Sequence, residues 1–188
     1  MKNPSIASSA FAAGDVRIRE IAATDSIAEL TALLHRAYAP LGAMGLNYTA
    51  VDQSAETTAR RVAEGLCHVA TRGDALVGTV VVGGPYERNE CAYYLRPGVA
   101  SVQQFAVDPR LQGGGVGRLL LARAEAWARA QGRTEIALDT AEPATHLVDF
   151  YRRLGYAHVG HTQWSGKVYR SVVMSKPLAR GLPTQDTA

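Results

Sequence analysis

The hydrophobic pattern of the first third of the chain changes its period. Apolar and polar residues alternate from Val16 to Ile21, which is typical of a strand with one buried face. Apolar residues then recur every three or four positions over 26–38, which predicts an amphipathic helix that ends before Pro40. A second helix is predicted over 54–64, and Gly65 ends it. The chain therefore opens with one strand and two helices.

The rest of the chain alternates between short apolar runs and helical patterns. The remaining expected elements are strands over 67–71, 75–82 and 100–107, a helix over 116–130, a strand over 134–139, a helix that begins at Pro143, and strands over 158–161 and 169–175. This order predicts an α/β fold of the α+β mixed-sheet type, in which a central sheet of mixed direction is flanked by helices.

The two later helices carry clear apolar faces. In the helix over 116–130 this face consists of Val116, Leu119, Leu120, Ala124, Trp127 and Ala128. Glu125 and Arg129 are four residues apart, so we expect them to pair on the solvent side of that helix. In the next helix the apolar face consists of Leu147, Phe150, Tyr151 and Leu154. Aromatic residues at helical spacing are usually core residues, so the pattern alone favours a packing role for Tyr151.

Length and composition are those of one soluble domain. The 188 residues are 47% hydrophobic and 20% charged. We expect the domain to cover 15–178, between disordered tails at 1–14 and 179–188. The net charge of +3 comes without a cluster of basic residues, so no nucleic-acid partner is expected. No apolar run approaches the roughly 18 residues that cross a membrane, so no membrane partner is expected either.

The cysteines and histidines argue against a disulfide-rich protein and against a metal-binding protein. Cys67 and Cys91 are too few for a disulfide framework, and free thiols in a reducing compartment predict a cytoplasmic location. The histidines show no metal-binding spacing, so no metal ion is expected.

A cluster of glycines lies between the strand over 100–107 and the helix that follows it. Four glycines occur within 113–117, and Arg118 comes next. Bare backbone amides at a helix N-terminus bind phosphate, so this segment is interpreted as a phosphate cradle, with a tight strand-to-helix turn as the alternative. The segment lacks the Gly-Lys-Ser/Thr of a Walker A loop. It also has arginine where the dinucleotide fingerprint requires its third glycine.

A different known pattern fits this segment. Val107-Asp108-Pro109 followed by Gln112-Gly113-Gly114-Gly115-Val116-Gly117 resembles the coenzyme A loop of the GNAT superfamily of N-acetyltransferases. The stretch FYRRLGY, residues 150–156, resembles the last conserved helix of the same family. The resemblance covers about 15–178. It implies a mixed sheet in which two parallel strands splay apart, with acetyl-CoA as the cosubstrate.

The resemblance also implies roles for individual residues. The backbone of Phe105, Ala106 and Val107 would bind the pantetheine arm, with an amide near Phe105 polarising the thioester carbonyl. The backbone amides of Gln112, Gly113, Gly114, Gly115, Val116, Gly117 and Arg118 would bind the pyrophosphate. Tyr151 would protonate the leaving thiolate. The activity implied is direct transfer of an acetyl group to an amine of a small molecule or peptide, by an enzyme of a family whose members are often homodimers.

Two features of the sequence depart from the family pattern. Some family members have a glutamate on the strand that precedes the glycines, and it acts as the general base. The corresponding positions here are Ser101, Gln103 and Gln104, none of which is ionisable. Glu87 and Glu90, in the preceding loop, are interpreted as exposed charges. Ala144 stands about where the family often has an asparagine. These departures leave a second hypothesis open, a non-catalytic module that binds acyl-CoA.

The acceptor remains open at this stage. In the family, several segments flank the acceptor site. The corresponding parts of this chain are the loop 41–52, which contains Met44, Asn47 and Tyr48, the run 93–95, and the residues Trp164 and Tyr169. A pocket role and a packing role are equally supported for these residues. No acidic cluster accompanies these segments, so the sequence gives no special support to a polycationic acceptor.

Overall fold

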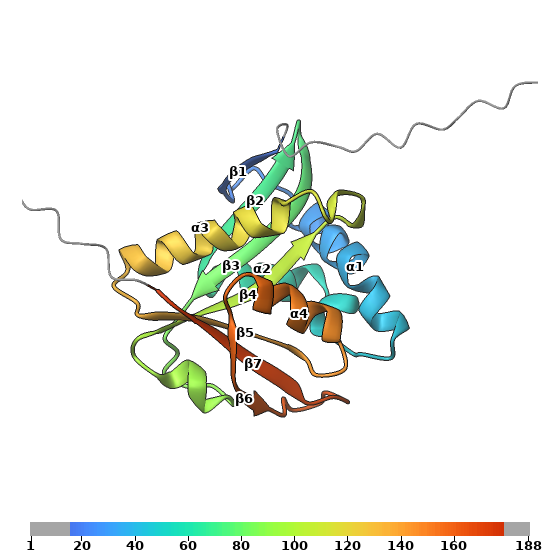
Figure 1. Cartoon of the computed structure of the whole chain (residues 1–188). Helices are drawn as coiled ribbons and strands as arrows, with labels where there is room; N and C mark the ends of the chain where they lie inside the picture. Colours follow the sequence, from blue (N-terminus) through green and yellow to red (C-terminus); the bar gives the residue numbers. More distant parts are fainter. Residues whose placement is uncertain (1–15, 179–188) are drawn as a thin grey trace, which may run out of the picture.

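The computed structural model describes residues 16–178, and the expected tails at 1–14 and 179–188 lie outside the described residues. The predicted order of strands and helices is confirmed. The strands are β1 (Arg17–Glu20), β2 (Leu66–Arg72), β3 (Ala75–Gly83), β4 (Val99–Val107), β5 (Glu135–Ala141), β6 (Ala157–Thr162) and β7 (Ser171–Pro177). The helices are α1 (Ile27–Ala43), α2 (Ala55–Ala63), α3 (Val116–Ala130) and α4 (Thr145–Arg153), and short 3-10 turns lie at Thr49–Val51, Ala92–Leu95 and Pro109–Leu111 (Figure 1).

The strands form one sheet in the order β1-β2-β3-β4-β5-β7-β6. All neighbouring strands are antiparallel except β4 and β5, which are parallel. This parallel pair is short, because only Val99, Ala100 and Ser101 of β4 have partners on β5. Beyond Ser101 the two strands separate, as Figure 1 shows. The expected mixed sheet with splayed parallel strands is therefore confirmed.

Two faces of the sheet are covered by different helices. Val80 and Val82 of β3 pack in the cluster that contains Leu120 of α3. Val81, between them, packs in the cluster that contains Leu30 of α1. Because neighbouring residues of a strand point to opposite faces, α1 and α3 lie on opposite sides of the sheet.

The end of α1 differs from the prediction. The helix continues through Pro40 to Ala43, although proline removes one helix hydrogen bond. Leu41 of this last turn is buried in a cluster with Leu46 and Tyr169. The packing of Leu41 compensates for the missing bond, so tertiary contacts override the local stop signal.

The buried face of α3 also differs from the prediction. Leu119, predicted to be buried, is 42% exposed, and Leu121 is buried in its place. Glu125 pairs with Arg129 as expected, but it is buried rather than on the solvent side. Its carboxylate also accepts hydrogen bonds from Lys176 Nζ of β7, at 2.9 Å, and from the Tyr156 hydroxyl, at 3.3 Å. These partners turn α3 so that Glu125 faces β7.

Candidate active site

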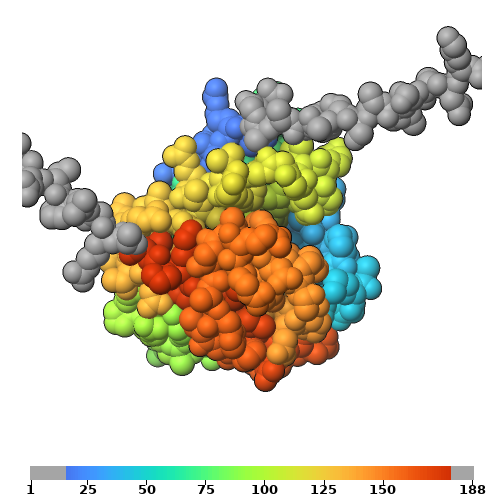
Figure 2. Space-filling view, in the orientation of Figure 1, coloured from blue at the N-terminus to red at the C-terminus, as the bar shows by residue number. Residues whose placement is uncertain are grey.

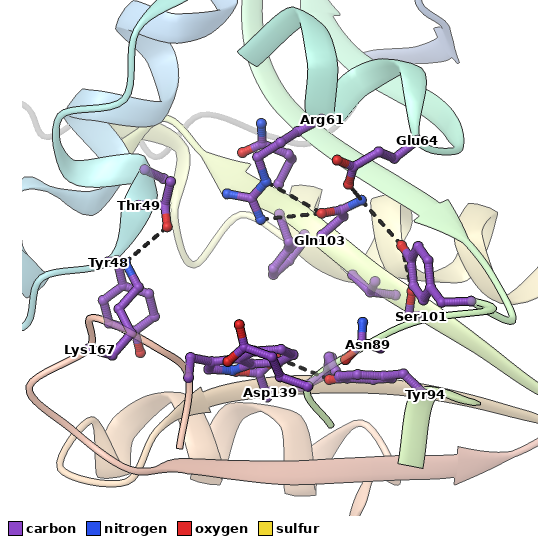
Figure 3. A pocket seen from close by; sticks show the side chains of 18 of the residues that line it. Tyr48, Thr49, Arg61, Glu64, Asn89, Tyr94, Ser101, Gln103, Asp139 and Lys167 are labelled. Carbon is purple, nitrogen blue, oxygen red and sulfur yellow. Dashed lines mark hydrogen bonds between the residues drawn. The ribbon is translucent and has the colours of Figure 1, made fainter. Parts of the chain in front are cut away.

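The separation of β4 and β5 opens a cavity of about 680 Å³. Its walls include β4 residues from Ser101 to Phe105, β5 residues Leu138 and Asp139, and Tyr151 of α4. Side chains from α1, α2 and the loops before β4 and β7 complete the lining (Figure 3). The cavity thus lies at the carboxyl ends of the only parallel strand pair in the described sheet, where open α/β sheets commonly bind ligands.

A β-bulge shapes the β4 wall of this cavity. Gln103 pairs with Val81 and Ala106 pairs with Thr79, so Gln104 and Phe105 lie together opposite Val80. Gln104 adopts a left-handed backbone conformation with φ 51°, which is uncommon for a residue with a side chain. A bulge interrupts the strand ladder and bends the strand, and here it does so where β4 lines the cavity.

The three residues expected to contact pantetheine divide between two environments. Phe105 lines the cavity, and its carbonyl accepts a hydrogen bond from the Tyr38 hydroxyl at 3.1 Å. Ala106 and Val107 are buried and continue the β4 ladder opposite Thr79 and Gly78. The bulge at 104–105 is therefore where β4 presents its backbone to the cavity.

The glycines before α3 are required for different structural reasons. Gly113 and Gly115 have φ of 79° and 85°, a conformation that residues with side chains rarely adopt. A Cβ on Gly117 would lie 3.1 Å from Phe105 Cζ, so this glycine permits close packing of α3 on β4. Two of the four glycines thus form the turn and a third allows the helix to approach the strand. These roles agree with the tight strand-to-helix turn considered as the alternative, and they are compatible with a phosphate cradle at the same segment.

The loop presents backbone amides at the surface. Gly114 N and Gln112 N donate to carbonyls within the turn, at 3.3 and 3.4 Å. Among the described residues, no acceptor is found for the amides of Gly113, Gly115, Val116, Gly117 and Arg118. The space-filling view shows the yellow-green segment before α3 at the surface (Figure 2). The segment is therefore not covered by other elements, and its amides and helix terminus suit an anion.

A buried carboxylate fixes the start of this loop. Asp108, 1% exposed, accepts hydrogen bonds from the Arg110 backbone and side chain and from Arg36 Nη2. The Arg110 contacts, opposed by burial and reinforced by Arg36, hold the pKa of Asp108 well below its usual range. Asp108 is therefore ionised at neutral pH and ties the end of β4 to the loop.

Tyr151 is a buried residue of α4 that lines the cavity. Its ring contacts Phe105, Phe150 and Tyr156, with centroid distances of 5.2–6.2 Å. No hydrogen-bond partner of its hydroxyl is found among residues 16–178, and the residue lines the cavity. Burial, with a smaller effect of neighbouring tyrosines, raises the pKa of Tyr151 well above its usual value. The phenol therefore keeps its proton at neutral pH.

Asp139 is a carboxylate that the sequence analysis did not identify. It lies on β5, where Asp139 Oδ2 accepts from Trp164 Nε1 at 2.8 Å and Oδ1 accepts from the Tyr94 hydroxyl at 3.0 Å. Both partners are neutral, and Asp139 lines the cavity across from β4. The sequence did contain one indication of this role, since Asp139 is the last residue of a predicted strand and ligands bind at the carboxyl ends of splayed parallel strands.

The structure separates the other candidates by position. Those that line the cavity are Ser101, Gln103, Gln104, Glu90, Tyr48, Tyr94, Trp164 and Tyr169, and those that do not are Met44, Asn47, Tyr93, Leu95 and Glu87. Glu90, interpreted as an exposed loop charge, is exposed, but it also borders the cavity and accepts a hydrogen bond from Ser165 N at 2.8 Å. Tyr48, Tyr94, Trp164 and Tyr169 line the cavity and also pack in hydrophobic clusters, so both features hold for these four residues.

The family comparison agrees with this geometry. The family model described as "Acetyltransferase (GNAT) family" matches residues 28–156, which is more than half of the chain. The chain belongs to the GNAT family. The matched region includes the phosphate-binding candidate loop, the bulged strand and all of α4.

Two curated relatives are acetyltransferases. S-(2-succino)cysteine N-acetyltransferase of Bacillus subtilis is 28% identical over 156 residues, which cover 82% of this chain and 92% of the relative. An IAA acetyltransferase of Azospirillum brasilense is 36% identical over 81 residues, which cover 43% of this chain and 53% of the relative.

Solved GNAT structures share the fold. The ribosomal-protein-S18-alanine N-acetyltransferase of Escherichia coli is 16% identical with a TM-score of 0.66, over 90% of this chain and 97% of that one. A GNAT family acetyltransferase of Elizabethkingia anophelis with acetyl-CoA bound is 15% identical with a TM-score of 0.62, over 87% of this chain and 99% of that one. At these identities the likeness concerns the fold alone.

Two further properties of this GNAT domain follow from the described residues. Within 16–178, no group of three or more His, Cys, Asp or Glu side chains could hold a metal ion, and no helix has the length and apolarity to span a bilayer. Both cysteines are buried and free. Burial raises the pKa of Cys67 to about 11, so its thiol is a poor nucleophile.

Proposed function

We propose that the protein transfers the acetyl group of acetyl-CoA directly to the nitrogen of an amine that enters the cavity. The observation that carries this proposal is the position of Tyr151, which keeps its hydroxyl proton and lines the cavity together with the bulged strand and Asp139. The acceptor class is a small-molecule or peptide amine. The B. subtilis relative, named for the N-acetylation of a cysteine derivative, supports a small acceptor. The proposal takes 15–178 as one catalytic domain.

Different parts of the chain would bind different parts of acetyl-CoA. Acetyl-CoA supplies an activated acyl group and a diphosphate. The segment Gln112–Arg118 would bind the diphosphate, chiefly through the amides of Gly113 and Gly115–Arg118, for which no acceptor is found among the described residues. The backbone of β4 at Phe105–Val107 would align the pantetheine, and the bulge would direct a backbone amide near Phe105 to the thioester oxygen.

Proton transfers would involve two side chains that line the cavity, Tyr151 and Asp139. As the amine nitrogen bonds to the acyl carbon and the carbon–sulfur bond breaks, the Tyr151 hydroxyl would donate its proton to the sulfur. The proton lost by the amine would pass to Asp139 or to water. Asp139 supplies the base that is absent at Ser101, Gln103 and Gln104, and it removes one argument for a non-catalytic role.

Release of free thiol from acetyl-CoA, measured with a panel of amines, tests the proposal. We expect thiol release that depends on both the protein and an amine, together with calorimetric binding of coenzyme A. Binding without thiol release for any amine would favour the non-catalytic acyl-CoA module, for which Ala144 in place of the family asparagine is the remaining support. Absence of binding to any coenzyme A species would contradict both functions.

A further inference from the structure

The charged residues that line the cavity are balanced in sign but not paired. Three are cationic and three are acidic: Arg61, Arg88, Lys167, Glu64, Glu90 and Asp139. Among the described residues, no salt bridge joins any of the six to another charge. Glu64, Arg88 and Glu90 are exposed to solvent, whereas Arg61, Asp139 and Lys167 are partly buried. A partly buried charge without a counterion favours a ligand that supplies the opposite charge.

The cation Lys167 is held in place by neutral groups. Lys167 Nζ donates to the Asn47 carbonyl at 2.7 Å and to Thr49 Oγ1 at 2.9 Å. The loop that carries it is fixed to the same segment, because the Asn47 side chain binds Gly166 O and Val168 N. A lysine that is immobilised without a carboxylate partner is preorganised for an anionic ligand group.

The cation Arg61 is also held by neutral groups. Its guanidinium donates to Gln103 Oε1 at 3.3 and 3.4 Å and to Gln53 Oε1 at 3.4 Å. Burial and, to a smaller extent, the nearby Arg61 charge lower the pKa of Lys167, with Asp52 acting in the opposite direction. The two cations thus influence each other across the cavity, and an anion near both would relieve this repulsion.

The acidic residues lie on more than one side of the cavity: Glu64 lies on the Arg61 side, where it accepts a hydrogen bond from Gln103 Nε2 at 2.9 Å, and Asp139 lies on the opposite side. Figure 3 shows Arg61 and Asp139 entering the cavity from opposite sides, with Lys167 at a third position. Among residues 16–178, the donors to the Asp139 carboxylate are the neutral Tyr94 hydroxyl and Trp164 Nε1. The cavity therefore offers a position for an ammonium group near Asp139 and a position for an anion near Arg61 and Lys167.

Resting on the proposed function, we propose that the acceptor is a zwitterionic, amino-acid-like molecule, whose amine lies near Asp139 and whose carboxylate binds Arg61 and Lys167. A carboxylate accepts charge-assisted hydrogen bonds from both cations, whereas a simple alkylamine or polyamine leaves them without a counterion. The two cations act as specificity determinants and take no part in the proton transfers.

The first test is substrate preference. Thiol release is measured for amino acids as free acids and as their C-terminal amides, with L-aspartate and L-glutamate also compared with L-asparagine and L-glutamine. We expect kcat/KM for at least one acid to exceed that of its matched neutral derivative by about tenfold or more, because a hydrogen bond to a charged group discriminates at this level. Equal or greater kcat/KM for the neutral derivatives in all pairs would overturn the inference.

Variants assign the preference to the two cations. Lys167→Gln and Arg61→Gln should each raise KM for the preferred acid by about tenfold to a hundredfold, with little change in kcat and little effect on the neutral derivative. Lys167→Arg keeps the charge and should keep the preference. Arg60→Gln is the matched control, since Arg60 is the exposed neighbour of Arg61 on α2 and does not line the cavity. A loss shared equally by acid and neutral derivative would contradict the assignment.

A binding measurement separates this inference from the proposed function. The preferred acid, or L-glutamate if no pair is turned over, and its amide are titrated calorimetrically into protein with and without coenzyme A, which carries no acetyl group to transfer. Tighter binding of the acid, lost in Lys167→Gln, supports the inference even if turnover is absent. Acetylation of amines without any preference for the acid in turnover or in binding would refute the inference while leaving the proposed function intact.

Discussion

At the scale of single residues, Tyr151 has the most specific environment. It contacts aromatic rings, it lines the cavity, and burial keeps its hydroxyl protonated. Replacement by phenylalanine removes one oxygen and preserves the packing. We expect Tyr151→Phe to lower kcat by about 10²-fold or more, as for the loss of a general acid. The calorimetric Kd for coenzyme A should change little, and an unchanged kcat would remove Tyr151 from the catalytic role.

The glycine turn provides a second prediction at this scale. Gly115 has φ 85°, so Gly115→Ala should cost about 1 kcal/mol of unfolding free energy and should weaken coenzyme A binding by displacing the amides. Gly45 has φ 79° and no heavy atom within 4 Å of an added Cβ, away from the loop. Gly45→Ala is therefore the matched control, with a similar stability loss and normal binding. Calorimetry with chemical denaturation measures both quantities, and equal affinities in the two variants would argue against the amide cradle.

A third prediction concerns the acid range. Contacts from Arg110 and Arg36 lower the pKa of Asp108 in the folded protein. Since the folded pKa is below the unfolded value, this stabilisation is complete above an unfolded pKa of about 3.9 and is lost as pH falls through the folded pKa. Asp108→Asn should cost about 2 kcal/mol near neutral pH, and the difference from wild type should shrink below about pH 4. Denaturation at several pH values checks this, and a difference independent of pH would contradict it.

At the scale of elements, Glu125 connects a helix to a strand. Its buried carboxylate binds Lys176 of β7 and Arg129 of α3. Glu125→Ala should lower the free energy of unfolding by about 2 kcal/mol, since Lys176 and the Tyr156 hydroxyl would lose their acceptor. Asp149→Ala, which removes an exposed ion pair with Arg152, should cost less than about 0.5 kcal/mol. Equal losses in the two variants would contradict a structural role for the buried carboxylate.

The elements also show what the sequence could predict. The existence and order of helices and strands follow from hydrophobic period, and α3 begins and ends where its pattern predicted. The rotation of α3 and the continuation of α1 through Pro40 depend on contacts with distant residues, which local patterns do not encode. The bulge at Gln104 was equally hidden, since it is a shift in the pairing register between β3 and β4, two strands whose separate patterns do not encode how they pair.

The candidate site was predictable only where its residues are close together in the sequence. The loop at Gln112–Arg118 and Tyr151 carry contiguous motifs, so the resemblance could locate them, although their roles remain predictions. Asp139, Arg61 and Lys167 come from separate elements, and only the folded chain brings them to one cavity. Residues that act through long-range proximity leave no local signature, whereas loops with special backbone conformations do.

At the scale of the whole molecule, ligand binding should stabilise the fold. A ligand that binds only the folded state at a hundredfold excess over Kd adds about 2.7 kcal/mol, which for a domain of this size raises Tm by about 5–10 °C. Coenzyme A should produce such a shift in thermal denaturation. The Gly115→Ala variant should show a smaller shift at the same concentration, while Gly45→Ala should respond as wild type does.

The three-residue junction between β4 and β5 has a consequence for how a ligand can enter and leave. The sheet consists of two antiparallel parts, β1–β4 and β5–β7. They are joined only where Val99, Ala100 and Ser101 of β4 pair with β5. The crevice beyond this junction exists without the rupture of any interstrand pairing. Exchange of molecules in it does not require partial unfolding, so the two parts can stay rigid through repeated cycles of loading and discharge.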